Sequence, residues 1–194
     1  EVENMGFKLL PPDINFSEPY FTKEGDRCIR FGFVGIKNVG VAPAEFITEI
    51  RNKTGKYKSY EDFISRADSR LVNKKILESL IMSGAMDSLY EKEKLDIEDK
   101  CIFRKRLMLS LEKNGVNNKP NFSQQEFLFS EQKQKEVVIE KYSEQEIFEQ
   151  EHFLTGIYWS GHPLEKHLNE INAIAKMHIE TLPEEDGKEV ELIG

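Results

Sequence analysis

The fold is decided by a short stretch, Ile36-Lys37-Asn38-Val39-Gly40-Val41-Ala42-Pro43-Ala44-Glu45-Phe46-Ile47. It reads as a tight hairpin that ends a strand and opens an amphipathic helix. Gly40 is expected to take the positive φ that a hairpin needs, and Asn38 tolerates the left-handed region better than most residues. Pro43 suits the first turn of a helix, where a missing N–H costs nothing. The hairpin amides are therefore expected to face outward.

Such a hairpin predicts a site for an anion. The first N–H groups of a helix lack intrahelical acceptors and mark the positive end of its dipole, and the neighbouring Lys37 adds charge. A nucleic-acid backbone is the anion that such a site attracts. The residues expected to form it are Lys37, Asn38, Val39, Gly40 and Val41. An ordinary helix start after a turn is the alternative that the local pattern leaves open.

The net charge of −8 is unevenly distributed along the chain. Residues 1 to 87 hold 13 basic and 13 acidic residues, so the whole acidic excess lies in the second half. Residues 51–75, here called the basic window, hold eight basic residues against Glu61, Asp62 and Asp68: Arg51, Lys53, Lys56, Lys58, Arg66, Arg70, Lys74 and Lys75. The basic window predicts phosphate contacts, with Lys74 and Lys75 joining the hairpin residues; a solvated surface is the alternative.

Length and composition describe a chain that can bury one sizeable core or two small ones, with 194 residues, 39% hydrophobic and 32% charged. Its apolar runs are shorter than the roughly 20 residues of a membrane span, so a soluble protein is expected. Cys28 and Cys101 lack CxxC spacing, which favours a reducing compartment without a disulfide framework or a zinc site. We expect a segment of a longer protein, because no initiator Met opens the chain and residues 190–193 alternate like a strand without a following partner.

Capping residues and apolar periodicity predict a mainly α fold. Residues 1–25 read as an extended, proline-rich segment, and residues 28–34 as a strand that feeds the hairpin. The expected apolar anchors of the first segment are Leu9, Leu10, Phe16 and Phe21. Helices are predicted over 41–51, after Ser59, from Asn73 to Ser83-Gly84, over 93–113, from a capping box at Ser143 to Gly156, and from Leu164 to Ile174. In the 93–113 helix, Arg104, Lys105 and Arg106 are expected on a polar face.

Residues 113–142 lose this periodicity and read as a mobile connector. They nevertheless contain Phe122, Phe127, Leu128 and Phe129, which a solvated linker has no reason to expose. Such a cluster either docks onto its own domain or binds another protein.

Several longer stretches carry a resemblance to a known family. They are Leu10-Pro11-Pro12-Asp13-Ile14-Asn15, Ile29-Arg30-Phe31-Gly32, the stretch from Leu71 to Ile81, Gly84-Ala85-Met86-Asp87, and the stretch from Leu154 to Leu164. In this order they resemble a piece of the alpha subunits of bacterial DNA polymerase III, the C-family replicative polymerases. The resemblance covers nearly the whole chain, and only about 90–142 does not align firmly. The hairpin itself resembles a helix-hairpin-helix motif, with Asn38 where that motif usually has Gly.

The resemblance implies a domain order and a fold class. Residues 1–34 resemble the end of a fingers domain, 35–112 a tandem helix-hairpin-helix unit, 113–142 a flexible segment, 143–187 a helical connector, and 188–194 the start of an OB-fold. The second, degenerate hairpin falls around Ser83 to Asp87. The implied fold is a mainly α, small helical domain with short strands in the fingers part and at the OB-fold start.

The resemblance also implies partners. In this family a clamp-binding pentapeptide of the form Gln-x-x-Leu-Phe follows the hairpins, and Gln125-Glu126-Phe127-Leu128-Phe129 fits it. Leu128 and Phe129 would fill an apolar pocket while Gln125 hydrogen-bonds at its rim; internal docking is the alternative. The implied partners are duplex primer-template DNA, the sliding clamp and other replicase subunits, in the bacterial cytoplasm and away from membranes.

No catalytic residue, metal site or cofactor is expected in this chain. Polymerase chemistry needs a carboxylate cluster that holds two Mg²⁺ ions, and no acidic pair stands at a strand end here. In the family, the catalytic aspartates belong to the palm. The parent protein would therefore be a DNA-directed DNA polymerase that uses Mg²⁺, and this segment would be inactive alone. The four histidines, His152, His162, His167 and His178, lack carboxylate or thiolate companions at ligand spacing.

Two hypotheses about function follow. The first is a module that binds duplex DNA and tethers a replicative polymerase to its clamp. The second is a protein-interaction or structural module that binds no DNA, which the acidic second half and the Asn38 departure favour. An unrelated repair protein would account for the hairpin but not for the flanking stretches.

Overall fold

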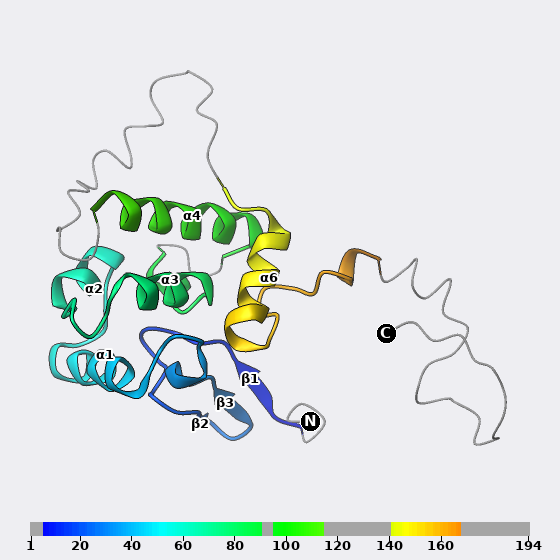
Figure 1. Cartoon of the computed structure of the whole chain (residues 1–194). Coiled ribbons are helices and arrows are strands. Elements are labelled where there is room, and N and C mark those ends of the chain that lie inside the picture. The colour runs from blue at the N-terminus through cyan, green and yellow to red at the C-terminus, as the bar shows by residue number, and fades with distance from the viewer. Residues whose placement is uncertain (1–5, 91–94, 115–140, 168–194) are drawn as a thin grey trace. The chain divides into compact units, whose positions relative to one another are not determined.

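Short helices make up most of the structure, as the sequence predicts. The computed structural model describes residues 6–90, 95–114 and 141–167 (Figure 1). Three strands come first, β1 (Lys8–Leu10), β2 (Thr22–Glu24) and β3 (Cys28–Arg30), followed by a 3-10 turn, η1 (Phe33–Gly35). The helices are α1 (Val41–Thr54), α2 (Tyr60–Arg66), α3 (Lys74–Met82), α4 (Ile97–Asn114) and α6 (Glu144–Thr155), with 3-10 turns η2 (Asp87–Leu89) and η4 (Glu165–His167). The described residues up to Ser160 form one compact unit, and η4 belongs to a second.

The three strands form a small sheet in the order β1-β3-β2, with β1 parallel and β2 antiparallel to β3. The first segment is therefore more ordered than the extended loop that its prolines predict. The strand predicted over 28–34 is shorter and ends at Arg30. Beyond it, the N–H groups of Phe33 and Val34 donate to the carbonyls of Glu18 and Pro19, which bends the chain into η1.

The apolar anchors predicted for the first segment are only partly correct. Phe16 and Phe21 are 47% and 51% exposed, so neither is a core residue. The buried residues of this segment are instead Pro12, Ile14, which is fully buried, and Ser17, whose hydroxyl donates to the Phe31 carbonyl.

The predicted helix starts are confirmed by their caps. The Ser59 hydroxyl accepts the N–H of Asp62 at the start of α2, and the Asn73 side chain accepts the N–H of Ile76 at the start of α3. At α6 the predicted capping box between Ser143 and Glu146 is complete. These bonds satisfy amides that the first helical turn leaves without intrahelical acceptors, which explains why the helices begin there.

The core lies around α3. Six of its nine residues are buried (Ile76, Leu77, Ser79, Leu80, Ile81 and Met82), because α4 and α6 pack against it. In Figure 1, α3 lies between α1 and α4, and α6 lies beside the ends of α3 and α4. Helix α4 begins and ends close to its predicted bounds, and within the described part of the chain no helix is long and apolar enough to cross a membrane. The predicted helix from Leu164 and strand at 190–193 lie mostly outside the described residues.

One close approach fixes the first segment against the hairpin region. A Cβ placed on Gly32 would lie 2.3 Å from the carbonyl carbon of Tyr20 and 2.6 Å from the nitrogen of Phe21. Those are backbone atoms, and the two hydrogen bonds that follow Gly32 hold them in place. Only glycine fits at this point.

Gly32→Ala is expected to lower the free energy of unfolding by about 1–3 kcal/mol or more, since the added methyl forces the two backbone segments apart. Urea unfolding followed by circular dichroism measures it. Gly40→Ser is the control, because a Cβ there meets nothing nearer than 3.9 Å and its φ of −81° suits any residue. Equal stability of Gly32→Ala and the parent chain would show that the segments are not in contact in solution.

Candidate nucleic-acid interface

The hairpin that opens α1 turns at Asn38, not at Gly40. Asn38 has φ +72°, whereas Gly40 has φ −81° and ψ 177° and is the N-cap of α1. The prediction of a positive φ at Gly40 is therefore wrong, because an N-cap needs an extended backbone. The left-handed residue stands where the resembled motif usually has Gly, and asparagine is the other residue type that visits this region readily.

The start of α1 leaves backbone donors open. Gly40 provides no side-chain cap, and the N–H groups of Gly40, Val41 and Ala42 donate to no acceptor in residues 6–90, 95–114 or 141–167. All three residues are exposed, and Val41 is 40% exposed. The helices α2, α3 and α6 each fill this position with a capping side chain. Helix α1 thus presents free amides at the positive end of its dipole.

Contacts from two other helices hold the hairpin in place. The Asn38 side-chain amide donates to the Ser79 hydroxyl of α3 at 3.0 Å, and the Lys37 N–H donates to the Leu154 carbonyl of α6 at 2.8 Å. Ile36 and Val39 are buried between these contacts, at 1% and 4% exposure. The hairpin is therefore fixed before any ligand arrives, and Val39 supplies packing and its backbone only.

The predicted lysines lie around the hairpin in different settings. The Lys37 ammonium lies 3.7 Å from the centroid of the Phe153 ring. Lys75 is exposed and stands one turn before Ser79 on α3, which places it roughly 5–6 Å along the helix surface from the residue that binds Asn38. The Lys74 ammonium is 3.8 Å from the Glu78 carboxylate. Lys37 and Lys75 have no carboxylate partner among the described residues.

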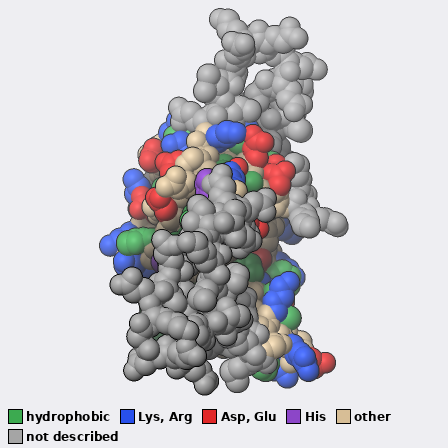
Figure 2. All heavy atoms as spheres, turned by 90° about the vertical axis from the view of Figure 1, so that its right-hand side faces the viewer, with side chains coloured by type: hydrophobic (Ala, Val, Ile, Leu, Met, Phe, Trp, Pro, Cys, Tyr) green, Lys and Arg blue, Asp and Glu red, His purple; other side chains and the backbone are tan. Residues whose placement is uncertain are grey.

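Most of the basic window is paired within the protein. The prediction that the basic window contacts phosphates is wrong for Arg51. Its side chain is 6% exposed and donates to the carbonyls of Ile14 and Ser17 and to the Glu18 carboxylate. Further pairs are Lys53 with Glu49, Arg66 with Asp62, and Arg70 with Asp68. Hydrogen bonds from Arg70 hold the pKa of the Asp68 carboxyl at about 2. On the side seen in Figure 2, acidic and basic side chains are likewise mixed where the grey atoms leave them visible.

The stretch expected as the second hairpin forms the turn between α3 and η2. Ser83, Ala85 and Met86 are fully buried, and the Ala85 carbonyl accepts the N–H of Ile14. Gly84 has φ +84°, and a Cβ there would lie 2.6 Å from the Arg104 guanidinium. This turn packs into the protein and offers no exposed donors like those of α1.

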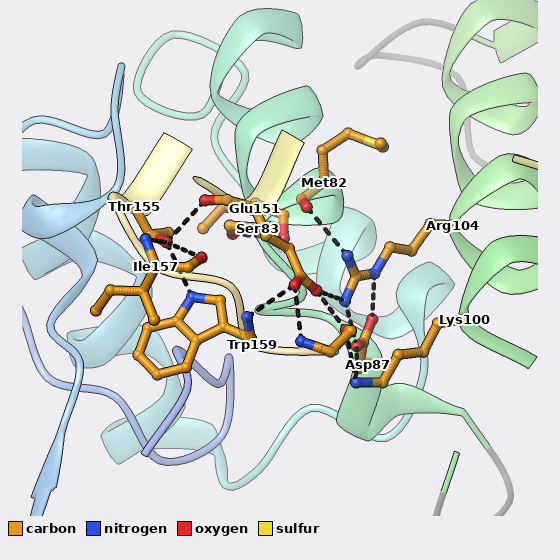
Figure 3. A network of polar contacts seen from close by, with 11 residues as sticks. Met82, Ser83, Asp87, Lys100, Arg104, Glu151, Thr155, Ile157 and Trp159 are labelled. Atoms are coloured by element: carbon orange, nitrogen blue, oxygen red, sulfur yellow. Dashed lines mark hydrogen bonds and ion pairs between the residues drawn. The ribbon is translucent and has the colours of Figure 1, made fainter. Parts of the chain in front are cut away.

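Beneath that turn lies a buried cluster of charges (Figure 3). Arg104 of α4 is 1% exposed and donates two hydrogen bonds to Asp87, at 2.9 and 2.7 Å, and one to the Met82 carbonyl. A further bond of 2.8 Å reaches Glu151 of α6, which is fully buried. Burial alone would lower the pKa of Arg104, but Asp87 and Glu151 together raise it, and the guanidinium is charged. Arg104 therefore does not lie on the polar face that the sequence predicts for it.

Glu151 extends the cluster to the end of the compact unit (Figure 3). Its carboxylate accepts the N–H groups of Trp159 and Ser160, at 2.9 and 2.8 Å, and the Ser160 hydroxyl. The Lys100 ammonium donates to the same hydroxyl. One carboxylate thus joins α4, α6 and the segment after α6, and fixes the rotation of α6 beside the hairpin.

A periodic signal could have revealed this pair. Arg104 follows the buried Cys101 by three residues and precedes the buried Leu111 by seven, so helical spacing places it on the apolar face. Glu151 stands in the same way four residues after Ile147 and three before Leu154. Opposite charges on two apolar faces predict a buried ion pair between helices. No comparable signal points to Phe153 or Ser79.

The remaining predicted site residues lie elsewhere. Gln125, Glu126, Phe127, Leu128 and Phe129 are outside the described residues, as is His178. His152 stacks on the Tyr158 ring with 4.5 Å between centroids. No group of three or more His, Cys, Asp or Glu side chains that could hold a metal ion occurs where the structure is described.

Comparison with known protein families identifies the motif that contains this hairpin. The family model of the helix-hairpin-helix motif matches residues 6–95, which include the hairpin, α1, α2 and α3. The chain thus carries the motif that its exposed turn and following helix suggest.

The relatives of the chain are long bacterial proteins. It is 34% identical over 189 residues to the DNA polymerase III subunit alpha of Borreliella burgdorferi, covering 93% of this chain and 16% of that protein. The subunit of Aquifex aeolicus is 38% identical over 162 residues, covering 84% of the chain and 12% of the relative. That of Escherichia coli K12 is 31% identical over 207 residues, with 100% and 17% covered. The chain is therefore related, over most of its length, to one segment of the bacterial DNA polymerase III alpha subunits, and spans about a sixth of their length.

Arg104→Ala is expected to cost about 3–5 kcal/mol of unfolding free energy, because it leaves two buried carboxylates without their cation. Urea unfolding followed by the fluorescence of Trp159, the only tryptophan of the chain, measures it beside the cluster. The matched control is Arg70→Ala, which removes an ion-paired arginine that is 87% exposed and is expected to change stability little. Equal effects of the two substitutions would contradict a dry, buried cluster.

Proposed function

We propose that this chain binds the backbone of duplex DNA without sequence preference, as part of a replicative DNA polymerase that it tethers to a sliding clamp. The observation that carries the DNA-binding part is the open start of α1, where the amides of three exposed residues, without acceptors among the described residues, stand beside Lys37. Helix N-termini with free amides and a nearby lysine bind phosphate groups. The relationship to DNA polymerase III alpha subunits supports the same proposal.

The absence of sequence preference follows from the groups that are free to act. Backbone amides and lysine ammonium groups bind phosphates, which carry no sequence information directly. Asn38 is the hairpin side chain best suited to read a base, and its amide is already bound to Ser79. We therefore propose Lys37, Asn38, Val39, Gly40 and Val41 as a phosphate site made of backbone and charge, with Lys74 and Lys75 contacting flanking phosphates.

The clamp contact is proposed from sequence. Gln125-Glu126-Phe127-Leu128-Phe129 matches the pentapeptide pattern, and three adjacent apolar residues in a polar stretch suit a short motif that fills a pocket on a partner. Within the parent protein we propose the domain order of fingers end, helix-hairpin-helix unit, clamp-binding segment, helical connector and OB-fold start. The parent would be a Mg²⁺-dependent DNA-directed DNA polymerase of the bacterial cytoplasm that works with other replicase subunits, and its catalytic residues would lie outside this segment.

A protein-interaction module that binds no DNA is the second candidate. The internal pairing of Arg51, Lys53, Arg66 and Arg70 favours it, because paired cations contribute little to phosphate binding. Absence of saturable binding to duplex at low salt would support this candidate over the first.

Replacement of Lys37, Lys74 and Lys75 by Gln is expected to weaken duplex binding and to flatten its salt dependence. Each lost phosphate contact removes about 0.9 from the slope of log K against log salt, so the triple variant should lose about two to three. Fluorescence anisotropy with two unrelated duplexes of about 20 base pairs, from low to physiological salt, measures both quantities and the lack of sequence preference.

The control for this experiment is Lys53→Gln, near the far end of α1. Lys53 is exposed and lies about 18 Å from the start of α1, because twelve residues separate it from Val41 at 1.5 Å each. Its slope should match that of the parent chain. A triple variant with unchanged affinity and slope would rule out the proposed phosphate surface.

Clamp binding is expected to depend on the pentapeptide. Gln125→Ala, Leu128→Ala and Phe129→Ala in one variant should weaken binding to the cognate sliding clamp by about a hundredfold or more, since they remove both anchors and the orienting amide. Isothermal titration measures it, and Phe122→Ala is the control for an apolar residue outside the motif. Clamp binding that survives the triple change would place the contact elsewhere; stability lowered by the same change would indicate internal docking.

A further inference from the structure

The hairpin lysine rests on α6 through both its backbone and its side chain. The Lys37 N–H donates to the Leu154 carbonyl, and the Lys37 ammonium lies 3.7 Å from the centroid of the Phe153 ring. Phe153 is 58% exposed, among the most exposed of the large apolar side chains in the described ranges. Because the ring contributes little to the core, core packing does not explain why a phenylalanine stands at this position.

Helix α6 holds this ring in a defined place. Glu151 is fully buried against Arg104, and Leu154 is 6% exposed, so the rotation of the helix is fixed from inside. Phe153 follows Glu151 by two residues, which is about 200° around a helix, and therefore points outward beside the hairpin. The rotation of α6 thus fixes where the Phe153 ring is attached, and the flexible side chain of Lys37 lies over this ring.

We propose that Phe153 is a positioning residue of the DNA interface, whose ring holds the Lys37 ammonium beside the free amides of α1 for a phosphate oxygen. This inference rests on the proposed DNA-binding function and assigns to it a residue outside the helix-hairpin-helix match. The role of the ring is to reduce the side-chain freedom that Lys37 loses when it meets a phosphate.

An aromatic ring suits this role better than a carboxylate. The ring attracts a cation through its quadrupole and leaves its charge unneutralised, so the ammonium N–H donors that point away from the ring stay available for phosphate and water. A carboxylate would hold the lysine equally well but would neutralise the charge that phosphate recognition needs. Glu78 is such a carboxylate for Lys74, since the Lys74 ammonium lies 3.8 Å from the Glu78 carboxylate.

The contact can be tested without DNA. In the free protein, the Lys37 side-chain methylene protons should show upfield ring-current shifts in NMR spectra, and Phe153→Ala should abolish them while Phe153→Tyr keeps them. Shifts that are absent from the parent chain would overturn the proposal whether or not the protein binds DNA. Since Phe153 is exposed, the melting temperature of Phe153→Ala should match that of the parent.

The effect on binding is a loss of affinity with the salt dependence kept. Phe153→Ala and Phe153→Leu should weaken duplex binding by about three- to tenfold, the range expected for one immobilised side chain, and Phe153→Tyr should restore it. Their slope of log K against log salt should equal that of the parent, because the phosphate contacts remain. Lys37→Gln, in contrast, should lower the slope by about one.

A double-mutant comparison separates positioning from direct contact. In a Lys37→Gln background, Phe153→Ala should have no further effect on affinity; an equal loss in both backgrounds would mean that Phe153 touches DNA itself and would overturn the proposal. Phe16→Ala is the matched control, since the Lys56 ammonium lies 3.7 Å from the Phe16 ring and neither residue belongs to the proposed phosphate site; it should leave affinity unchanged. If Lys37→Gln has no effect on binding while the NMR contact is present, the hairpin proposal fails instead.

Discussion

The buried pairing of Arg104 with Glu151 and Asp87 is the interaction on which the arrangement of the helices depends. Three hydrogen bonds from one guanidinium reach a carboxylate of η2 and a carboxylate of α6, and the other oxygen of Glu151 accepts two backbone amides after α6. A buried charge without its partner is strongly destabilising. The cluster therefore allows one relative placement of α4, α6 and the turn after α3, and the Leu154 carbonyl then reaches the Lys37 N–H.

Other basic residues are likewise paired within the protein. Arg51 and Arg104 are buried and hold backbone carbonyls and carboxylates, and Arg66 and Arg70 are paired on the surface. These four arginines thus serve the fold, and the cations described beside the hairpin are Lys37, Lys74 and Lys75. A site with few free cations binds one stretch of phosphates weakly, and a second contact in the same polypeptide raises the effective concentration of the first. The clamp contact of the proposed function would be such a second contact.

Local features of the fold could be predicted well from the sequence, and long-range contacts could not. Ser59, Asn73, Ser143 and Gly156 mark helix ends because capping acts within four residues. The sequence predicts the position of the hairpin correctly but assigns its left-handed residue to Gly40, since propensity alone prefers glycine over Asn38. Phe16 and Phe21 are predicted as apolar anchors but are exposed, because hydrophobicity does not tell which apolar residues a short segment can bury. The partners Ser79 and Leu154 lie 41 and 117 residues from their hairpin contacts, beyond any local pattern.

The start of α1 has no side-chain cap, whereas the starts of α2, α3 and α6 are each capped by a side chain. Ser59, Asn73 and Ser143 each place an oxygen on the amides of the first turn. Gly40 places nothing there, although its backbone is extended as a cap requires and a side chain would meet no close neighbour. A serine at this position would fit and would satisfy a donor, at a gain of a few tenths of a kcal/mol. The start of α1, which lies beside Lys37, lacks this stabilisation. In the proposed function, the hydroxyl oxygen of a serine at position 40 would occupy the place of a phosphate oxygen. A small loss of stability is expected at a site that, in the proposed function, receives an external acceptor.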